Sequence, residues 1–145
     1  MGDDKNYYLI DFFLEKLDPK QQSHKVINLY LRYKDRFRFR KMTYDEKGND
    51  GFGYWCRKLA RDEYDLSLPL EPLKCNKDKV SHFDVHVPHF KAKRVFLPRS
   101  HPFVERLIDQ LVYFPDSKIE DDGVDMMSSL LDNFKDKVAP SVYFG

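Results

Sequence analysis

The chain has 145 residues, which suits one compact domain, and its composition is 41% hydrophobic and 15% aromatic, which excludes an intrinsically disordered protein. Its 25 basic and 24 acidic side chains give a formal net charge of +1, which excludes a simple polycationic nucleic-acid binder but allows a local basic surface. Cys56 and Cys75 are not in a CxxC spacing, which argues against a disulfide scaffold or a thiolate zinc site and favours a reducing compartment. The sequence contains no recognisable signal peptide and no run of about 18 apolar residues, so we expect a soluble, intracellular protein.

Strands and helices are expected to alternate through the first half of the chain. The predicted elements are a strand over 6–13, a helix over 19–34, a strand over 36–44, a helix over about 50–62 and a short strand over 66–73. The Asp18-Pro19 pair marks the start of the first helix, because proline is tolerated in the first helical turn. In the second strand, Phe37 and Phe39 alternate with arginines, and a glycine-containing turn follows.

The second half of the chain continues this alternation. The predicted elements are a helix over 77–87 that ends or kinks at Pro88, a short strand over 94–97, helices over 101–114 and about 120–135, and a C-terminal tail over about 136–145. Six apolar side chains recur at helical spacing in the helix over 101–114: Phe103, Val104, Leu107, Ile108, Leu111 and Val112. The whole pattern predicts an α/β fold, with one domain over 1–145 and helices packed on a central sheet.

Three carboxylates crowd into the start of the final predicted helix. Asp121, Asp122 and Asp125 share one arc of roughly 100° with Asp132 on a helical wheel. The opposite face is apolar and is expected to lie in the core: Val124, Met127, Leu130, Leu131 and Phe134. Acidic residues in the first turn of a helix interact favourably with the helix dipole and stabilise the helix by about 0.3–1 kcal/mol each. Stabilisation of the helix start is therefore one explanation of the cluster. Like charges at this spacing repel by a few tenths of a kcal/mol, so a divalent metal ion bound by carboxylate oxygens is the alternative.

A second acidic position, Asp45-Glu46, follows the strand predicted over 36–44. Ligands of open α/β sheets gather at the carboxyl ends of strands. A carboxylate at a strand end and a carboxylate-bearing helix are parts of a two-metal nuclease site, in which the ions hold the attacking and leaving oxygens of a phosphodiester. An ordinary polar turn is the alternative interpretation of these two residues.

The order of the segments is itself informative. A strand NYYLID, a strand end KMTYDEKG, an amphipathic segment FVERLIDQLVYFP and a helix start EDDGVD follow one another. This order resembles the nuclease domain of the large terminase subunit of tailed bacteriophages, and the resemblance covers about residues 6–134. It implies a ribonuclease-H-like fold, with a mixed central sheet flanked by helices. It also implies a DNA endonuclease that uses two Mg²⁺ or Mn²⁺ ions to cut concatemeric double-stranded DNA during genome packaging.

The resemblance also implies the site residues. The family's strand-end acid falls on Asp45, with Glu46 as the alternative, and its last acid falls in the cluster on the final helix. The implied catalytic residues are Asp45, Asp122 and Asp125. The implied metal ligands are Asp45, Asp121, Asp122 and Asp125. Glu120 stands where the family usually has a histidine, directly after the segment that ends at Phe114-Pro115.

Partners and location follow from the same resemblance. Lys77 and Lys79 match the family's basic segment and are expected to contact phosphates of double-stranded DNA. The terminase ATPase domain, the small terminase subunit and the portal protein are the other implied partners. The implied location is the cytoplasm of the infected bacterial host, with no membrane contact.

The sequence departs from the family at two points. The family domain begins with two further strands, the first of which carries a catalytic aspartate, and no GxxxxGKS or GxxxxGKT loop of the ATPase half occurs. We therefore expect a partial domain whose first strands are missing and which lacks the first catalytic aspartate. The alternatives are a non-catalytic remnant that binds DNA or a partner, and another ribonuclease-H-like nuclease such as a transposase or resolvase.

Three histidines and two aromatic residues have simpler interpretations. His82 and His86 are four residues apart on a possible helix, and His89 follows them. Because no Glu-x-x-His pattern or nearby cysteine accompanies them, we expect surface or capping roles rather than metal ligation. Tyr54 and Trp55, at the start of a predicted helix, are expected to lie in the core.

Overall fold

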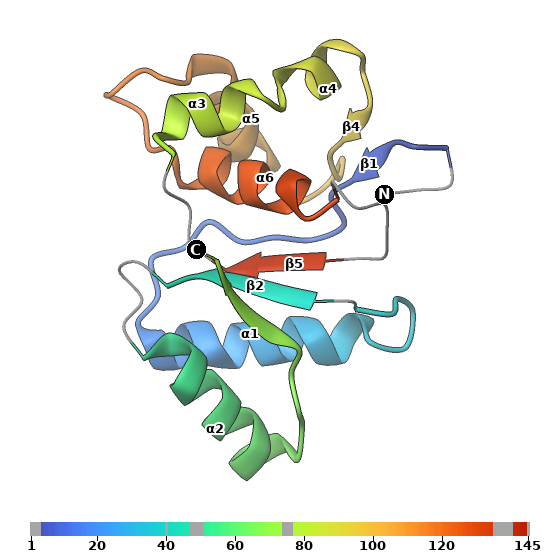
Figure 1. Ribbon diagram of the computed structural model, residues 1–145, viewed down its shortest axis with the longest axis vertical. Coiled ribbons are helices and arrows are strands. Elements are labelled where there is room, and N and C mark those ends of the chain that lie inside the picture. The colour runs from blue at the N-terminus through green and yellow to red at the C-terminus, as the bar shows by residue number, and fades with distance from the viewer. Residues whose placement is uncertain (1–3, 40, 47–50, 74–76, 135–140, 145) are drawn as a thin grey trace. The chain divides into compact units, whose positions relative to one another are not determined.

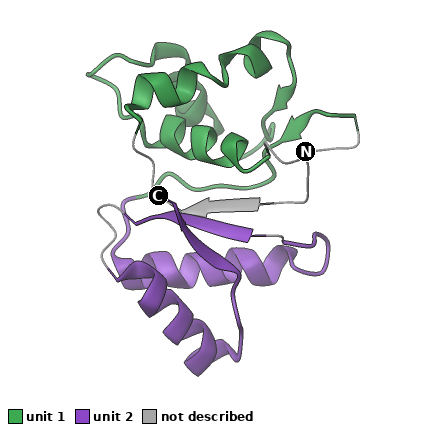
Figure 2. Ribbon diagram, viewed as in Figure 1, with its two compact units in different colours: residues 1–15, 76–137 green, residues 16–75, 138–145 purple. Residues whose placement is uncertain are grey.

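The computed structural model describes residues 4–39, 41–46, 51–73, 77–134 and 141–144 (Figure 1). The chain divides into two compact units, whereas the sequence predicted one domain (Figure 2). Unit 1 contains residues 1–15 and 76–137, and unit 2 contains residues 16–75 and 138–145. The described residues form a mixed α/β structure, with six helices and short strands in two small sheets. Within these residues, none of the helices has the length and apolar character needed to cross a membrane.

Unit 2 contains a parallel sheet with one central strand. Its strands are β2 (Lys41–Asp45), β3 (Leu70–Leu73) and β5 (Ser141–Phe144), in the order β3-β2-β5. The position of β5 shows that the predicted C-terminal tail contains a strand. Every strand pairing in the described part of the chain is parallel, whereas the expected central sheet was mixed.

Two helices of unit 2 pack with this sheet. They are α1 (Pro19–Tyr33) and α2 (Phe52–Tyr64), close to the predicted bounds. The start of α1 is set by a reciprocal cap: Asp18 Oδ1 accepts from Gln21 N at 2.8 Å, and Gln21 Oε1 accepts from Asp18 N at 3.2 Å. The helix α2 connects β2 to β3, as a parallel pair of strands requires.

An apolar core holds the elements of unit 2 together. Nine buried residues from α1, β2, α2, β3 and the segment before β3 form it: Val26, Ile27, Met42, Tyr44, Phe52, Cys56, Ala60, Leu68 and Leu70. Met42 and Tyr44 lie two residues apart, so they face the same side of β2. Burial of a large apolar side chain contributes about 1.5–3 kcal/mol, so this cluster is the main source of stability in unit 2.

Two sequence predictions for unit 2 are corrected. The strand predicted over 36–44 begins only at Lys41, because Phe37 N still donates to Tyr33 O at 2.9 Å and continues the turn after α1. Tyr54 and Trp55 are not in the core: they are 62% and 56% exposed. They lie on the outer side of α2, whereas residues such as Cys56 and Ala60 form its buried side.

Unit 1 contains the remaining helices and a minimal sheet. Its elements are β1 (Tyr7–Tyr8), α3 (Lys79–Asp84), α4 (Val87–Lys91), β4 (Val95–Phe96), α5 (Val104–Tyr113) and α6 (Asp122–Asp132). The strand predicted over 6–13 is reduced to β1, which pairs with β4 in parallel. Beyond β1, the chain contacts the rest of unit 1 through side chains. Asp11 Oδ1 lies 2.8 Å from His101 Nε2, and the ring of Phe12 stacks on the ring of His101.

The helix predicted over 77–87 is divided between α3 and α4. The break comes before Pro88, which lies in the first turn of α4, where its missing N–H is tolerated. The predicted apolar face of α6 is confirmed for Val124, Met127 and Leu131, which are at most 5% exposed.

Cys56 offers a test of the core of unit 2. Burial raises the pKa of its thiol to about 11, and its side chain has no exposed surface. In a Cys75→Ser variant, we expect the remaining thiol to react with Ellman's reagent near pH 8 only after denaturant is added, because the thiolate is the reactive form. Absorbance of the released thiolate measures the reaction. Complete reaction in native buffer, as fast as in denaturant, would show that this core is not formed.

Candidate functional site

The helices α3 and α6 lie side by side in unit 1 (Figure 1). Carboxylates of α6 lie along the side that contacts α3. Asp121, Asp125 and Asp132 are spaced so that they lie on one side of the helix. Each of them contacts a residue of the segment that contains α3 and the start of α4. The shared acidic arc that the sequence predicted is therefore the surface on which α3 docks.

Lys79, the first residue of α3, lies between two of these carboxylates. Its Nζ is 2.7 Å from Asp121 Oδ1 and 3.0 Å from Asp125 Oδ2. The hydrogen bond to Asp121 is the main cause that raises the pKa of Lys79. Burial raises the pKa of Asp125 and outweighs the attraction of Lys79. The two shifts are compatible because Asp121 is the principal partner, and Lys79 supplies the positive charge that offsets repulsion among the aspartates.

Asp122 turns toward α5 instead. Its Oδ1 accepts a hydrogen bond from Gln110 Nε2 at 2.9 Å, and Gln110 Oε1 accepts from Gly123 N at 2.6 Å. Gln110, which is 2% exposed, thus caps the start of α6, where the side chain of Asp121 makes no capping bond. A Cβ on Gly123 would lie 2.6 Å from Gln110 Oε1 and 2.8 Å from Leu107 Cδ1. Glycine therefore permits the close approach of α5 that this cap requires.

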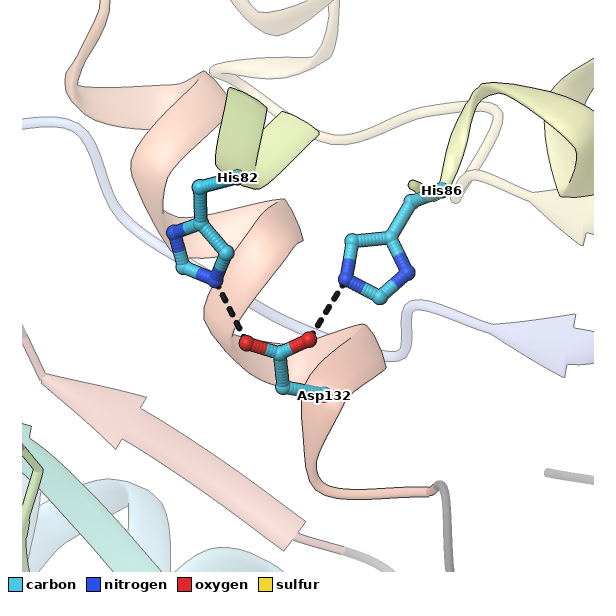
Figure 3. Close-up of side chains that lie close together, drawn as sticks. All are labelled: His82, His86 and Asp132. Atoms are coloured by element: carbon cyan, nitrogen blue, oxygen red, sulfur yellow. Dashed lines mark hydrogen bonds and ion pairs between the residues drawn. The ribbon is translucent and has the colours of Figure 1, made fainter. Parts of the chain in front are cut away.

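His82, His86 and Asp132 converge at the other end of α6 (Figure 3). His82 Nε2 lies 2.5 Å from Asp132 Oδ2, and His86 Nε2 lies 2.7 Å from Asp132 Oδ1. The two histidines are 7% and 3% exposed, and the aspartate side chain is 29% exposed. One potential ligand atom from each residue lies within 4.8 Å of the other two, which is close enough for a shared metal ion.

The electrostatics of this cluster reflect its burial. Burial alone would raise the pKa of Asp132, but the hydrogen bonds from His82 and His86 together outweigh it and lower the pKa. Burial lowers the pKa of His86, and Asp132 restores only part of that shift. Within the described residues, the buried Nδ1 of His86 has no hydrogen-bond partner. The cluster thus combines a stabilised carboxylate with an imidazole that favours its neutral form.

The surface roles predicted for His82 and His86 are wrong, because both side chains are buried, and the side chain of His86 makes no capping hydrogen bond to α4. Their partner Asp132 lies 46 residues beyond His86 in sequence, and only the packing of α6 on α3 brings it close. The only sequence signal for this cluster was the four-residue spacing of the two histidines, together with the position of Asp132 on the acidic arc of the final helix. His89 is outside the hydrogen-bonded group, and its ring lies 5.9 Å from that of His86, centroid to centroid.

The residues implied by the terminase resemblance are distributed over both units. Asp45 is the last residue of β2 in unit 2, at a strand end as predicted, and Glu46 follows it. The three aspartates at the start of α6 belong to unit 1. The structure brings Asp121 and Asp125 together around Lys79, while Asp122 binds Gln110. Lys77 precedes α3 in unit 1.

Comparison with protein-family models, with curated proteins and with solved structures finds no match to this chain. The terminase resemblance therefore rests on the order and spacing of the sequence motifs.

Substitution of Lys79 tests the charge balance at the start of α6. We expect Lys79→Met to lower the free energy of unfolding by roughly 1 kcal/mol, because Asp121 and Asp125 lose their shared cation while all three side chains remain partly exposed. Urea denaturation measures the loss, which should shrink in about 1 M NaCl because salt screens the exposed charges.

The matched control is Lys91→Met, which removes an exposed lysine of α4 in the same unit. An equal loss in both variants, or a loss in Lys79→Met that salt does not reduce, would contradict the assigned role of Lys79.

Proposed function

We propose that this chain is the C-terminal endonuclease part of a phage large terminase subunit, a family whose complete nuclease domain cleaves concatemeric double-stranded DNA with two Mg²⁺ or Mn²⁺ ions. The sequence order supports the proposal, since a strand-end acid, the Phe114-Pro115 segment and the aspartates of α6 follow one another as in that family. A ribonuclease-H-like fold is part of the same proposal. The parallel β2–β3 pair joined through α2 supports an α/β sheet of that general kind.

The observation that carries the proposal is the convergence of Asp121 and Asp125 on one cation. Both carboxylates lie within 3.0 Å of Lys79 Nζ, and both are partly exposed. Paired carboxylates with access to water suit Mg²⁺ or Mn²⁺, because these ions take oxygen ligands and retain several waters. In the proposed DNA complex, Asp121 and Asp125 hold an ion in place of the ammonium group, and Lys79 turns to a DNA phosphate.

Asp122 adds a third carboxylate from the α5 side of the helix start. Its hydrogen bond from Gln110 Nε2, at 2.9 Å, fixes the orientation of the carboxylate group. The bound ions would stabilise the charge that develops on the attacking and leaving oxygens of the phosphodiester. The resemblance alone implies Asp45 as a metal ligand and Lys77 as a second phosphate contact.

Nicking of supercoiled plasmid DNA tests the proposed activity. We expect the chain, once joined to the two missing N-terminal strands of the family domain, to nick the plasmid in Mn²⁺ and to be inactive in excess EDTA. Asp122→Asn and Asp125→Asn should each lower the nicking rate by at least about tenfold, because each removes a carboxylate from the metal site. Gel densitometry of the nicked form measures the rate.

The matched control is Asp109→Asn, an exposed acid on α5 that should leave the rate unchanged. The proposal fails if the completed domain does not nick DNA in Mn²⁺, or if both substitutions leave nicking intact. DNA binding that falls steeply with salt, without any nicking, would favour the non-catalytic binding remnant instead.

A further inference from the structure

We propose that His82, His86 and Asp132 form a site for a divalent transition-metal ion of the Zn²⁺ class. The three residues come from α3, from the residue that precedes α4 and from the last position of α6 (Figure 3). The site is separate from the proposed nuclease site and does not depend on it, because the two use different residues at opposite ends of α6.

The donor set determines the class of metal. Two imidazole nitrogens and one carboxylate oxygen are ligands that Zn²⁺ binds readily, at about 2.0–2.2 Å. Mg²⁺ and Ca²⁺ prefer sites made of oxygen atoms only. The carboxylates at the start of α6 and this cluster should therefore select different ions.

The geometry needs only small adjustments to accept the ion. The three potential ligand atoms lie within 4.8 Å of one another, and each imidazole already contacts its own oxygen of Asp132, at 2.5 and 2.7 Å. In a tetrahedral zinc site the ligand atoms lie about 3.3 Å apart, so side-chain displacements on the order of 1 Å suffice. Backbone hydrogen bonds anchor both histidines, since His82 N donates to Asp78 O at 2.9 Å and His86 N donates to Phe83 O at 2.8 Å.

The metal-free arrangement leaves a buried polar atom without a partner. When His86 donates Nε2–H to Asp132, its Nδ1 lone pair is buried and no described residue donates to it. An unsatisfied buried polar group destabilises a folded protein. In the other tautomer of His86, the Nε2 lone pair faces the carboxylate of Asp132, and a cation between these two groups removes their repulsion. A cation at this position would therefore replace a contact between a lone pair and a carboxylate with two ligand bonds.

The exposure of the cluster leaves a position for water. The histidines are almost fully buried, while the Asp132 side chain is 29% exposed. Three protein ligands and one water complete a tetrahedral zinc site. Metal binding would link the end of α6 to α3 and to the start of α4, and so it should stabilise unit 1.

The test uses the full chain, stripped of metal with EDTA and then titrated with ZnCl₂. We expect one Zn²⁺ per chain by elemental analysis after dialysis, and a rise in Tm of about 5 °C or more near saturation. His82→Gln, His86→Gln and Asp132→Asn should each weaken Zn²⁺ binding on the order of 100-fold, measured by calorimetry, because each removes one of three ligands. Excess Mg²⁺ should not displace the Zn²⁺.

His24→Gln is the matched control. It removes a histidine of unit 2 that contacts Tyr64 Oη at 3.0 Å, and it should bind Zn²⁺ as the wild type does. The proposal is overturned if the wild-type chain does not bind Zn²⁺ stoichiometrically, or if His24→Gln weakens binding as much as the cluster variants do.

A second measurement needs no variant and so remains decisive if the substitutions prevent folding. Diethyl pyrocarbonate modifies a histidine only while its ring is accessible, so the buried His82 and His86 react when the cluster opens locally. Mass spectrometry locates the modified residues. Zn²⁺ should slow the modification of His82 and His86 selectively, while His24 reacts at an unchanged rate. The proposal is contradicted if Zn²⁺ leaves the modification rates of His82 and His86 unchanged, as it should leave that of His24.

Discussion

The carboxylate of Asp132 lies within hydrogen-bond distance of two buried imidazoles, and this contact links α3 and the start of α4 to α6. His82 belongs to α3, His86 precedes α4, and Asp132 ends α6, so one side chain connects three elements. Loss of one partner leaves a buried polar group unsatisfied, at a cost of about 1–3 kcal/mol. These contacts between α3 and α6 are polar and directional, whereas the core cluster of unit 2 is apolar.

Both ends of α6 depend on this arrangement. Because α3 is held beside α6, Lys79 at the start of α3 reaches Asp121 and Asp125, and the proposed oxygen-ligand site forms around those carboxylates. The opposite end presents the nitrogen and oxygen donors of the proposed zinc site. One docked helix pair therefore positions the two clusters for which we propose different metal preferences, and the proposed difference follows from donor chemistry.

Local sequence signals predicted the helices well. The Asp18-Pro19 pair predicted the start of α1 because the capping interactions are made within four residues. Helical periodicity placed Val124 and Met127 in the core, since a helix must bury its apolar face. The predicted strands were too long. The lengths of β1 and β2 depend on how many residues pair with a neighbouring strand, and this pairing is a tertiary property. Trp55 was misplaced because hydrophobic character alone does not state which side of α2 is buried.

The site was predicted only in part, for the same physical reason. Asp121 and Asp125 lie close together in the sequence, so their clustering could be predicted. Lys79, the cation between them, lies 42 residues before Asp121, so local sequence did not reveal it. The histidine cluster needs Asp132 from 46 residues beyond His86, and no local pattern identifies such a partner.

The most direct test is amide hydrogen exchange of the metal-free Asp132→Asn variant and the wild type, resolved by peptide. If Asp132 holds α3 on α6, the amides of α3 should exchange about tenfold faster or more in the variant, while those of α1 in unit 2 keep their wild-type rates. Unchanged exchange in α3 would show that the Asp132 carboxylate does not hold this helix in place.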